Sequence, residues 1–140
     1  MTDSRNDIAL VERIYGFNWA SVGGRERGLE KLEGMIAPDF ESRLSDEVGG
    51  RTVQGIQGLR DFGDALEQDF SELRYEPRDF RSASDGRIVA TGRIVGVARA
   101  SHMPLSGTFG HIWTLRDGKA LAVRAHLDST EALEAAGLEP

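Results

Sequence analysis

The residue best suited to acid–base chemistry is His111, in the segment Phe109–Asp128, FGHIWTLRDGKALAVRAHLD. An imidazole has a pKa near neutrality, so it can accept or donate a proton without strong tuning. His111 alternates with Trp113 along an apolar strand pattern, and a second strand follows the turn. A histidine in this position is either a catalytic group or a hydrogen-bonded core residue, and the pattern leaves both open.

The turn between the two strands decides which face His111 occupies. A three-residue Arg116-Asp117-Gly118 loop pairs Leu115 with Lys119 and sets His111 opposite Val123. A two-residue Asp117-Gly118 turn would set it opposite Arg124 instead. We expect the three-residue loop, because it gives His111 a uniformly apolar face, made of Trp113, Leu115, Val123, Ala125 and Leu127.

Other chemistries lack the residues they need. The chain has no cysteine, which excludes disulfides, thiolate nucleophiles and cysteine metal sites. His102 is expected in a loop and His126 on the face opposite His111, so we expect no metal site. The sequence has no phosphate-binding glycine loop, dinucleotide fingerprint or serine-hydrolase elbow, so we expect no cofactor.

Length and charge narrow the class of protein. The 140 residues suit a single domain spanning 1–140, and a formal charge of −6 argues against a nucleic-acid partner. No apolar run reaches the length of a membrane span, and the N-terminus MTDSRNDIAL lacks the pattern of a signal peptide. We therefore expect a cytoplasmic protein without nucleic-acid or membrane partners.

The N-terminal half has helical periodicity. One long helix is predicted over Asn6–Val22, stopped by Gly23 and Gly24, and a short one over Gly28–Ile36 that ends before Pro38. The alternation of Phe40, Ser42 and Leu44 predicts a half-buried strand. A glycine-rich turn, VGGRTVQG, leads to a third helix over Gly58–Phe70.

The second half alternates with period two. Strands are predicted over Leu73–Ser82, Arg87–Ala100, Thr108–Leu115 and Lys119–Leu127. Pro77 marks the first of these as an edge strand or a bulge. Asp128 is the expected cap of a final helix, with Glu131 three residues on and Gly137 at its end. Helices followed by a curved antiparallel sheet indicate an α+β fold with an apolar cavity between them.

This order of elements resembles the SnoaL-like proteins of the nuclear transport factor 2 superfamily, a cone-shaped half-barrel with helices packed on a curved sheet. The residues that carry the resemblance are APDFE (37–41), GIQGLRDF (55–62) and HIWTLRDGKALAVRAHLDSTEALEAAGL (111–138). The superfamily includes ketosteroid isomerase, limonene epoxide hydrolase, polyketide cyclases, accessory subunits and binding proteins. The resemblance therefore specifies the fold and leaves the reaction open.

The resemblance also implies positions for catalytic groups. The oxyanion-hole aspartate of ketosteroid isomerase falls on His111, its tyrosine within about one residue of Tyr15, and its general base near Leu44, which cannot accept a proton. The arginine of limonene epoxide hydrolase resembles Arg93, but its two acids fall on Val95 and Ala125. Neither mechanism is therefore expected as such, and His111 is the acid–base candidate for a cyclase-like role.

Two functions follow as alternatives. In the first, the protein binds a small, mostly apolar oxygenated molecule and acts as a cofactor-free acid–base enzyme of the isomerase, cyclase or lyase type, with His111 and Tyr15 as catalytic groups. In the second, it is a non-catalytic binding or scaffold domain. The expected ligand-binding wall is Trp19, Phe40, Phe62, Trp113, Val123 and Leu127.

The outer sheet face predicts a homodimer. Val89, Thr91, Val95 and Val97 are more apolar than a free surface strand needs, and Arg93 and Arg99 stand beside them. We expect a second copy to cover this face, which makes surface or dimer contact the expected role of Arg93. His102, His126 and Arg99 are expected to be solvated.

Overall fold

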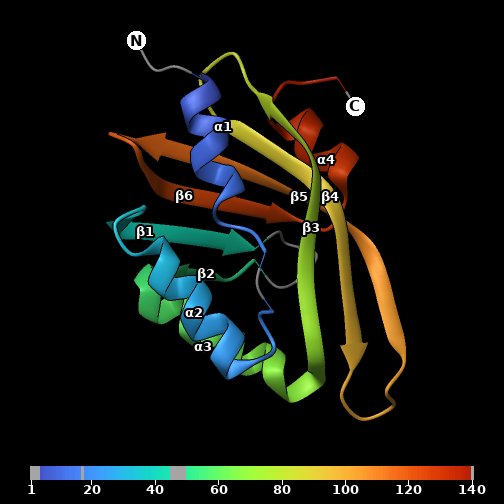
Figure 1. Cartoon of the computed structure of the whole chain (residues 1–140). Helices are drawn as coiled ribbons and strands as arrows, with labels where there is room; N and C mark the ends of the chain where they lie inside the picture. The colour runs from blue at the N-terminus through green and yellow to red at the C-terminus, as the bar shows by residue number, and fades with distance from the viewer. Residues whose placement is uncertain (1–3, 17, 45–49, 140) are drawn as a thin grey trace.

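The computed structural model describes residues 4–16, 18–44 and 50–139, which form four helices and a six-stranded sheet (Figure 1). The helices are α1 (Ser4–Glu12), α2 (Val22–Leu32), α3 (Gly55–Asp69) and α4 (Ser129–Ala135). The strands are β1 (Ile36–Leu44), β2 (Thr52–Gln54), β3 (Phe70–Ser82), β4 (Ile88–Ala98), β5 (Pro104–Arg116) and β6 (Lys119–His126). This arrangement confirms the α+β fold and the curved, open sheet.

The sheet is mixed, whereas the sequence predicted an antiparallel one. Its order is β2-β1-β6-β5-β4-β3, and β1 runs parallel to β6 while every other pair is antiparallel. Because α3 and four strands separate β1 from β6 in the chain, no hairpin fixes their relative direction. Local patterns cannot reveal such a long-range pairing.

The N-terminal helical region is divided differently from the prediction, since α1 ends at Glu12 and α2 begins at Val22. Gly16, four residues beyond the end of α1, adopts a positive φ of 106°, so a right-handed helix cannot continue through it. Asn18 Oδ1 then accepts a hydrogen bond from Leu73 N at 2.9 Å, and Trp19 N donates to Leu73 O at 2.9 Å. These bonds attach the connecting segment to β3, so tertiary pairing overrides the helical period.

Gly23 and Gly24 lie in the first turn of α2, so the prediction that they stop a helix was wrong. Ser21 is the N-cap, and its hydroxyl accepts a hydrogen bond from Gly24 N at 3.2 Å. A serine before two glycines is therefore a start signal here. The predicted turn at 48–55 contains β2, while its residues 48 and 49 lie outside the described ranges.

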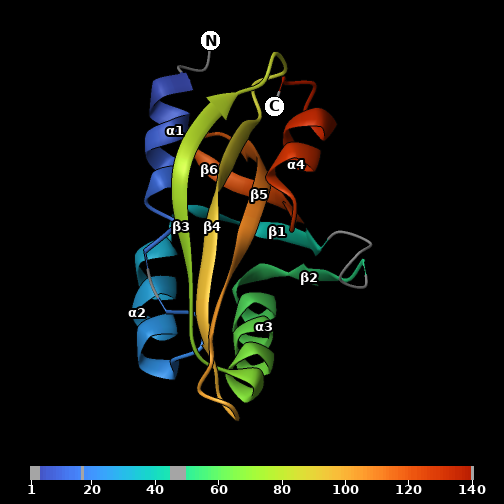
Figure 2. The same cartoon turned by 90° about the vertical axis from the view of Figure 1, so that its right-hand side faces the viewer.

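β3 confirms both expectations for Pro77. It is the last strand of the sheet, and its register with β4 shifts between Pro77 and Asp79. Gly92 faces Pro77 across the pair, and a Cβ added there would overlap Glu76 O. A glycine opposite a proline bulge thus allows the curvature of the long strands seen in Figure 2.

The β5–β6 turn is a two-residue turn, so the three-residue loop was wrong. Arg116 pairs with Lys119, and Asp117 and Gly118 both take positive φ. The register then shifts between Thr114 and Leu115, and His111 ends opposite Ala125. Without this shift the two-residue turn would set His111 opposite Arg124. With it, His111 lies on the same face as Val123 and Ala125, as expected, although its cross-strand partner is Ala125 instead of Val123.

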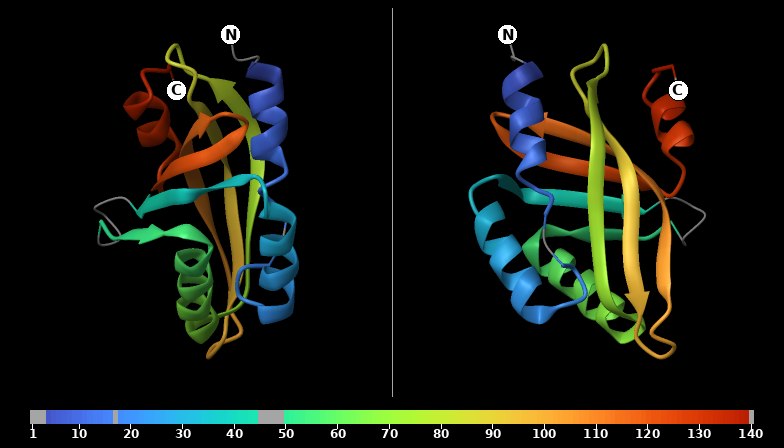
Figure 3. Two further views of the ribbon diagram at one scale, coloured as in Figure 1. Left: turned by 90° about the vertical axis from the view of Figure 1, so that its left-hand side faces the viewer. Right: turned by 45° about the vertical axis from the view of Figure 1, so that its right-hand side comes forward.

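Two hydrophobic clusters occupy opposite faces of the sheet. The larger one, on the concave face, includes Val11 from α1, Leu29 and Leu32 from α2 and Leu59 from α3. The smaller one lies beneath α4, which packs on the convex face (Figure 3). Asp128 caps α4 as expected, accepting hydrogen bonds from Thr130 N and Glu131 N. None of the described helices is long and apolar enough to cross a membrane.

Candidate functional site

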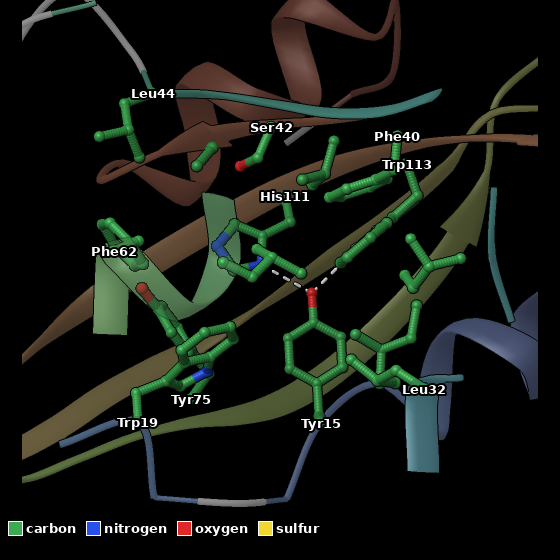
Figure 4. Close-up of a pocket in the computed structure, with 15 residues that line it drawn as sticks. Tyr15, Trp19, Leu32, Phe40, Ser42, Leu44, Phe62, Tyr75, His111 and Trp113 are labelled. Atoms are coloured by element: carbon green, nitrogen blue, oxygen red, sulfur yellow. Dashed lines mark hydrogen bonds between the residues drawn. The ribbon is translucent and has the colours of Figure 1, made fainter. Parts of the chain in front are cut away.

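A cavity lies between the concave face of the sheet and a cover formed by α2, α3 and the segment that joins α1 to α2 (Figure 4). Its inner chamber has a volume of about 60 Å³. Its walls are almost entirely apolar and aromatic, and the polar lining residues are Tyr15, Ser42, Tyr75 and His111. A chamber of this size holds a few water molecules or the head group of a larger ligand.

An outer chamber of about 370 Å³ adjoins the inner one. The two share five lining residues: Leu44, Phe62, Tyr75, His111 and Ala125. Arg51 is the one arginine or lysine among the described residues that line either chamber, and none of those residues is an aspartate or glutamate. The combined space therefore suits an apolar molecule of one or two rings, with His111 and Tyr75 at the junction.

A short chain of hydrogen bonds fixes His111. Trp113 Nε1 donates to the Tyr15 hydroxyl at 2.9 Å, and the same hydroxyl lies 2.7 Å from His111 Nδ1. An indole N–H can only donate, so the Tyr15 oxygen accepts from Trp113. Among the described residues, His111 Nδ1 is the acceptor within reach of the Tyr15 proton. This assignment puts the imidazole proton on Nε2.

The free edge of His111 faces the cavity. No described residue forms a hydrogen bond with Nε2, and Figure 4 shows this edge turned away from Tyr15 toward the side on which Phe62 lies. The imidazole ring is held by aromatic neighbours, with ring centroids 4.6 Å from Phe109 and 5.0 Å from Tyr75. His111 therefore offers a fixed N–H donor to a molecule in the cavity.

Burial keeps the polar groups of the site uncharged. It lowers the pKa of His111 to about 3, with a smaller contribution from the charge on His126. Burial also raises the pKa of Tyr75 to about 12, and it raises the pKa of Tyr15 although the Trp113 hydrogen bond opposes the change. At neutral pH the imidazole is neutral and weakly basic, which suits hydrogen-bond donation better than proton abstraction.

The expected site residues are largely brought together. His111, Tyr15, Trp19, Phe40, Phe62, Trp113 and Val123 all line the inner chamber. Leu127 does not reach it: the side chain is 45% exposed and lies on the outer chamber. β6 ends at His126, so the expected strand position of Leu127 does not exist.

The structure also shows the exposure of the other two histidines and of the two arginines expected on the outer face of the sheet. His126 is 7% exposed, contrary to the expectation of a solvated side chain, because α4 covers it and its Nδ1 lies 3.0 Å from Glu131 Oε1. His102, Arg93 and Arg99 are exposed, as expected. Within the described ranges no group of three histidine or acidic residues could hold a metal ion.

Several polar lining residues were not anticipated as site residues, among them Ser42, Tyr75 and Arg51. The signal for Ser42 was present, because it alternates with Phe40 and Leu44 on a strand face expected to be buried. Tyr75 alternates with Leu73 in the same way. However, a bulge at the nearby Pro77 changes which residues share a face of the strand, so the alternation alone does not place Tyr75 on the buried face. Arg51 follows a glycine-rich segment without periodicity, which gives no indication of what it faces.

Comparisons with known proteins agree with this architecture. A sequence model of the SnoaL-like domain matches residues 19–123. A protein named TerC, co-crystallised with polyporic acid, superimposes with a TM-score of 0.71 at 25% identity, covering 94% of this chain and 98% of its own. None of the curated proteins compared with the chain matches it.

Two further structures are similar in fold. An NTF2-like protein of unknown function from Burkholderia pseudomallei K96243 gives a TM-score of 0.70 at 22% identity, covering 96% of this chain and 97% of its own. A protein from Jannaschia sp. CCS1, described as a SnoaL-like polyketide cyclase, gives 0.70 at 20% identity, covering 97% and 94%. At these identities the likeness concerns the fold alone.

Proposed function

Since the chain belongs to the SnoaL-like domain family, we propose that it binds a small, mostly apolar molecule whose oxygen atom accepts a hydrogen bond from His111. The observation that carries this proposal is the His111 Nε2–H, which has no partner among the described residues and faces an apolar cavity. A donor that faces an apolar cavity is stabilised when a ligand or water oxygen in that cavity accepts its hydrogen bond.

The apolar body of the ligand occupies the outer chamber. Phe62, Leu66, Phe70, Ile94 and Phe109 form much of its wall, and burial of a hydrophobic body there supplies most of the affinity. The TerC structure, a similar fold that was co-crystallised with polyporic acid, supports a ligand-binding role for such a fold. The narrow inner chamber admits the oxygen-bearing end.

A second candidate function is cofactor-free catalysis of the isomerase, cyclase or lyase type. The donor at His111 could stabilise negative charge developing on a carbonyl oxygen, and Tyr15 would position the imidazole for this role. Such a reaction also needs a base, yet the resemblance places the general base near Leu44, which lines the inner chamber. No lining residue described here is a carboxylate, which favours binding over catalysis.

Titration with 6-propionyl-2-(dimethylamino)naphthalene tests the proposal, because this neutral ketone changes its emission when its carbonyl accepts a hydrogen bond. We expect saturable binding to the native protein and about tenfold weaker binding to His111→Ala, with Arg93→Gln on the convex face as the unaffected control. Urea unfolding of each variant establishes that the fold persists. Absence of saturable binding to the native protein would refute the proposal.

The homodimer remains a separate proposal, on a smaller surface than the sequence suggested. Val89 is 1% exposed beneath α4, so a partner cannot use it. Thr91, Val95 and Val97 are half-buried on the convex face beside the exposed Arg93. We expect a second copy to cover this strip and bury on the order of 800 Å² per subunit. Light scattering that returns a monomer mass at micromolar concentration would contradict this.

A further inference from the structure

Tyr75 has a polar group that the fold does not use. Its hydroxyl forms no hydrogen bond with any described residue, although the side chain lies in both chambers of the cavity. Tyr15, by contrast, has its hydroxyl engaged by both Trp113 and His111. The two tyrosines therefore differ in kind: one positions the imidazole, and the other is available to a ligand.

Tyr75 and His111 come from different strands and meet at the junction of the chambers. Tyr75 lies on β3 and His111 on β5, with ring centroids 5.0 Å apart and planes at 60°. Figure 4 shows the Tyr75 hydroxyl on the same side of the cavity as the free edge of His111, toward Phe62. Both groups thus face the point where a ligand head group must pass from the outer to the inner chamber.

The chemistry of the pair selects a particular oxygen. Because Nδ1 of His111 accepts a hydrogen bond from Tyr15, Nε2 carries the proton and acts as a donor, not as an acceptor. The phenol hydroxyl of Tyr75 can also donate. A carbonyl oxygen has two lone pairs and can accept from both, whereas an alkyl chain or an ammonium group cannot. Two neutral donors in an apolar wall therefore favour an oxygen that accepts without donating, such as a ketone carbonyl, because a hydroxyl brings a proton that needs its own acceptor and a carboxylate brings a charge that is costly to bury.

We infer that Tyr75 is a specificity-determining residue, donating with His111 to one carbonyl oxygen of the ligand. The inference rests on the proposed function, because it presupposes a molecule in this cavity. It narrows the ligand class from any oxygenated apolar compound to carbonyl compounds whose apolar body fills the outer chamber.

Tyr75→Phe tests the inference with two fluorescent probes of similar shape. One is 6-propionyl-2-(dimethylamino)naphthalene, and the other is 2-(dimethylamino)naphthalene, which lacks the carbonyl. We expect Tyr75→Phe to weaken binding of the ketone by about tenfold and to shift its bound emission to shorter wavelength. Binding of the carbonyl-free probe should not change, because the ring of residue 75 is retained.

The outcomes separate the two proposals. If the native protein binds neither probe, the proposed function fails and the inference fails with it. If the native protein binds the ketone, but Tyr75→Phe changes neither its affinity nor its emission, Tyr75 is not a ligand contact and the inference alone is overturned. An equal loss of affinity for both probes would also overturn it, since that result indicates altered packing instead of a lost hydrogen bond.

Discussion

Tyr15→Phe is expected to destabilise the protein strongly, because one hydroxyl serves two buried groups. Removal of the hydroxyl leaves His111 Nδ1 without its donor and Trp113 Nε1–H without its acceptor. The side chains concerned are 8% and 5% exposed, so bulk water cannot replace the lost partner freely. Each unsatisfied buried group costs roughly 1–3 kcal/mol.

We therefore expect Tyr15→Phe to lower the free energy of unfolding by about 2–4 kcal/mol. In a domain of this size the corresponding fall in Tm is roughly 6–15 °C. Urea and thermal unfolding followed by circular dichroism measure both quantities. The ring packing against Phe109 and Phe80 is preserved by phenylalanine, so the loss reports on the hydroxyl.

Tyr75→Phe is the matched control for this prediction. It removes the same atom from the same residue type in the same cavity, but no described residue is bonded to that atom. We expect its free energy of unfolding to stay within about 0.5 kcal/mol of the native value. If both variants were equally stable, or if Tyr75→Phe were the less stable, the assigned chain from Trp113 through Tyr15 to His111 would be wrong.

Three further predictions concern stability. Gly63→Ala is expected to lower the free energy of unfolding, because a Cβ there would overlap the buried Arg25 side chain that pairs with Asp64. Gly23→Ala, at an exposed position of α2, should raise the free energy of unfolding by about 0.5–1 kcal/mol, and urea unfolding distinguishes the two variants. The pKa of His111 is lowered from its ordinary 6.5 to about 3, so the unfolded chain binds the extra proton between these values. This contribution to stability is complete above pH 6.5 and is lost as the pH falls toward 3. Relative to His111→Gln, the native protein should lose up to about 1.4 kcal/mol per pH unit in that window, and parallel curves would contradict the assignment. Asp128→Ala should cost about 1 kcal/mol in thermal unfolding by uncapping α4, and an unchanged Tm would show that the cap is not used.

The sequence determined those parts of the fold that depend on local patterns. Alternating residues located β1 and the strands from β3 to β6, and the Asp128 cap located the start of α4, because burial of one face and capping are properties of neighbouring residues. The same alternation placed Phe40, Trp113 and Val123 on the buried face, and they line the cavity.

Only the tertiary structure decided how distant segments meet. The parallel pairing of β1 with β6 and the end of α1 at Glu12 depend on partners far away in the chain. The shift of register between β5 and β6, which sets His111 opposite Ala125, is a feature of how the two strands pair that their alternation does not reveal. For His111, the pattern left a catalytic and a core role open, because a sequence cannot show what each ring nitrogen contacts. The structure assigns Nδ1 to Tyr15 and leaves Nε2 facing the cavity, because the segment between α1 and α2 places Tyr15 on one side of the imidazole only.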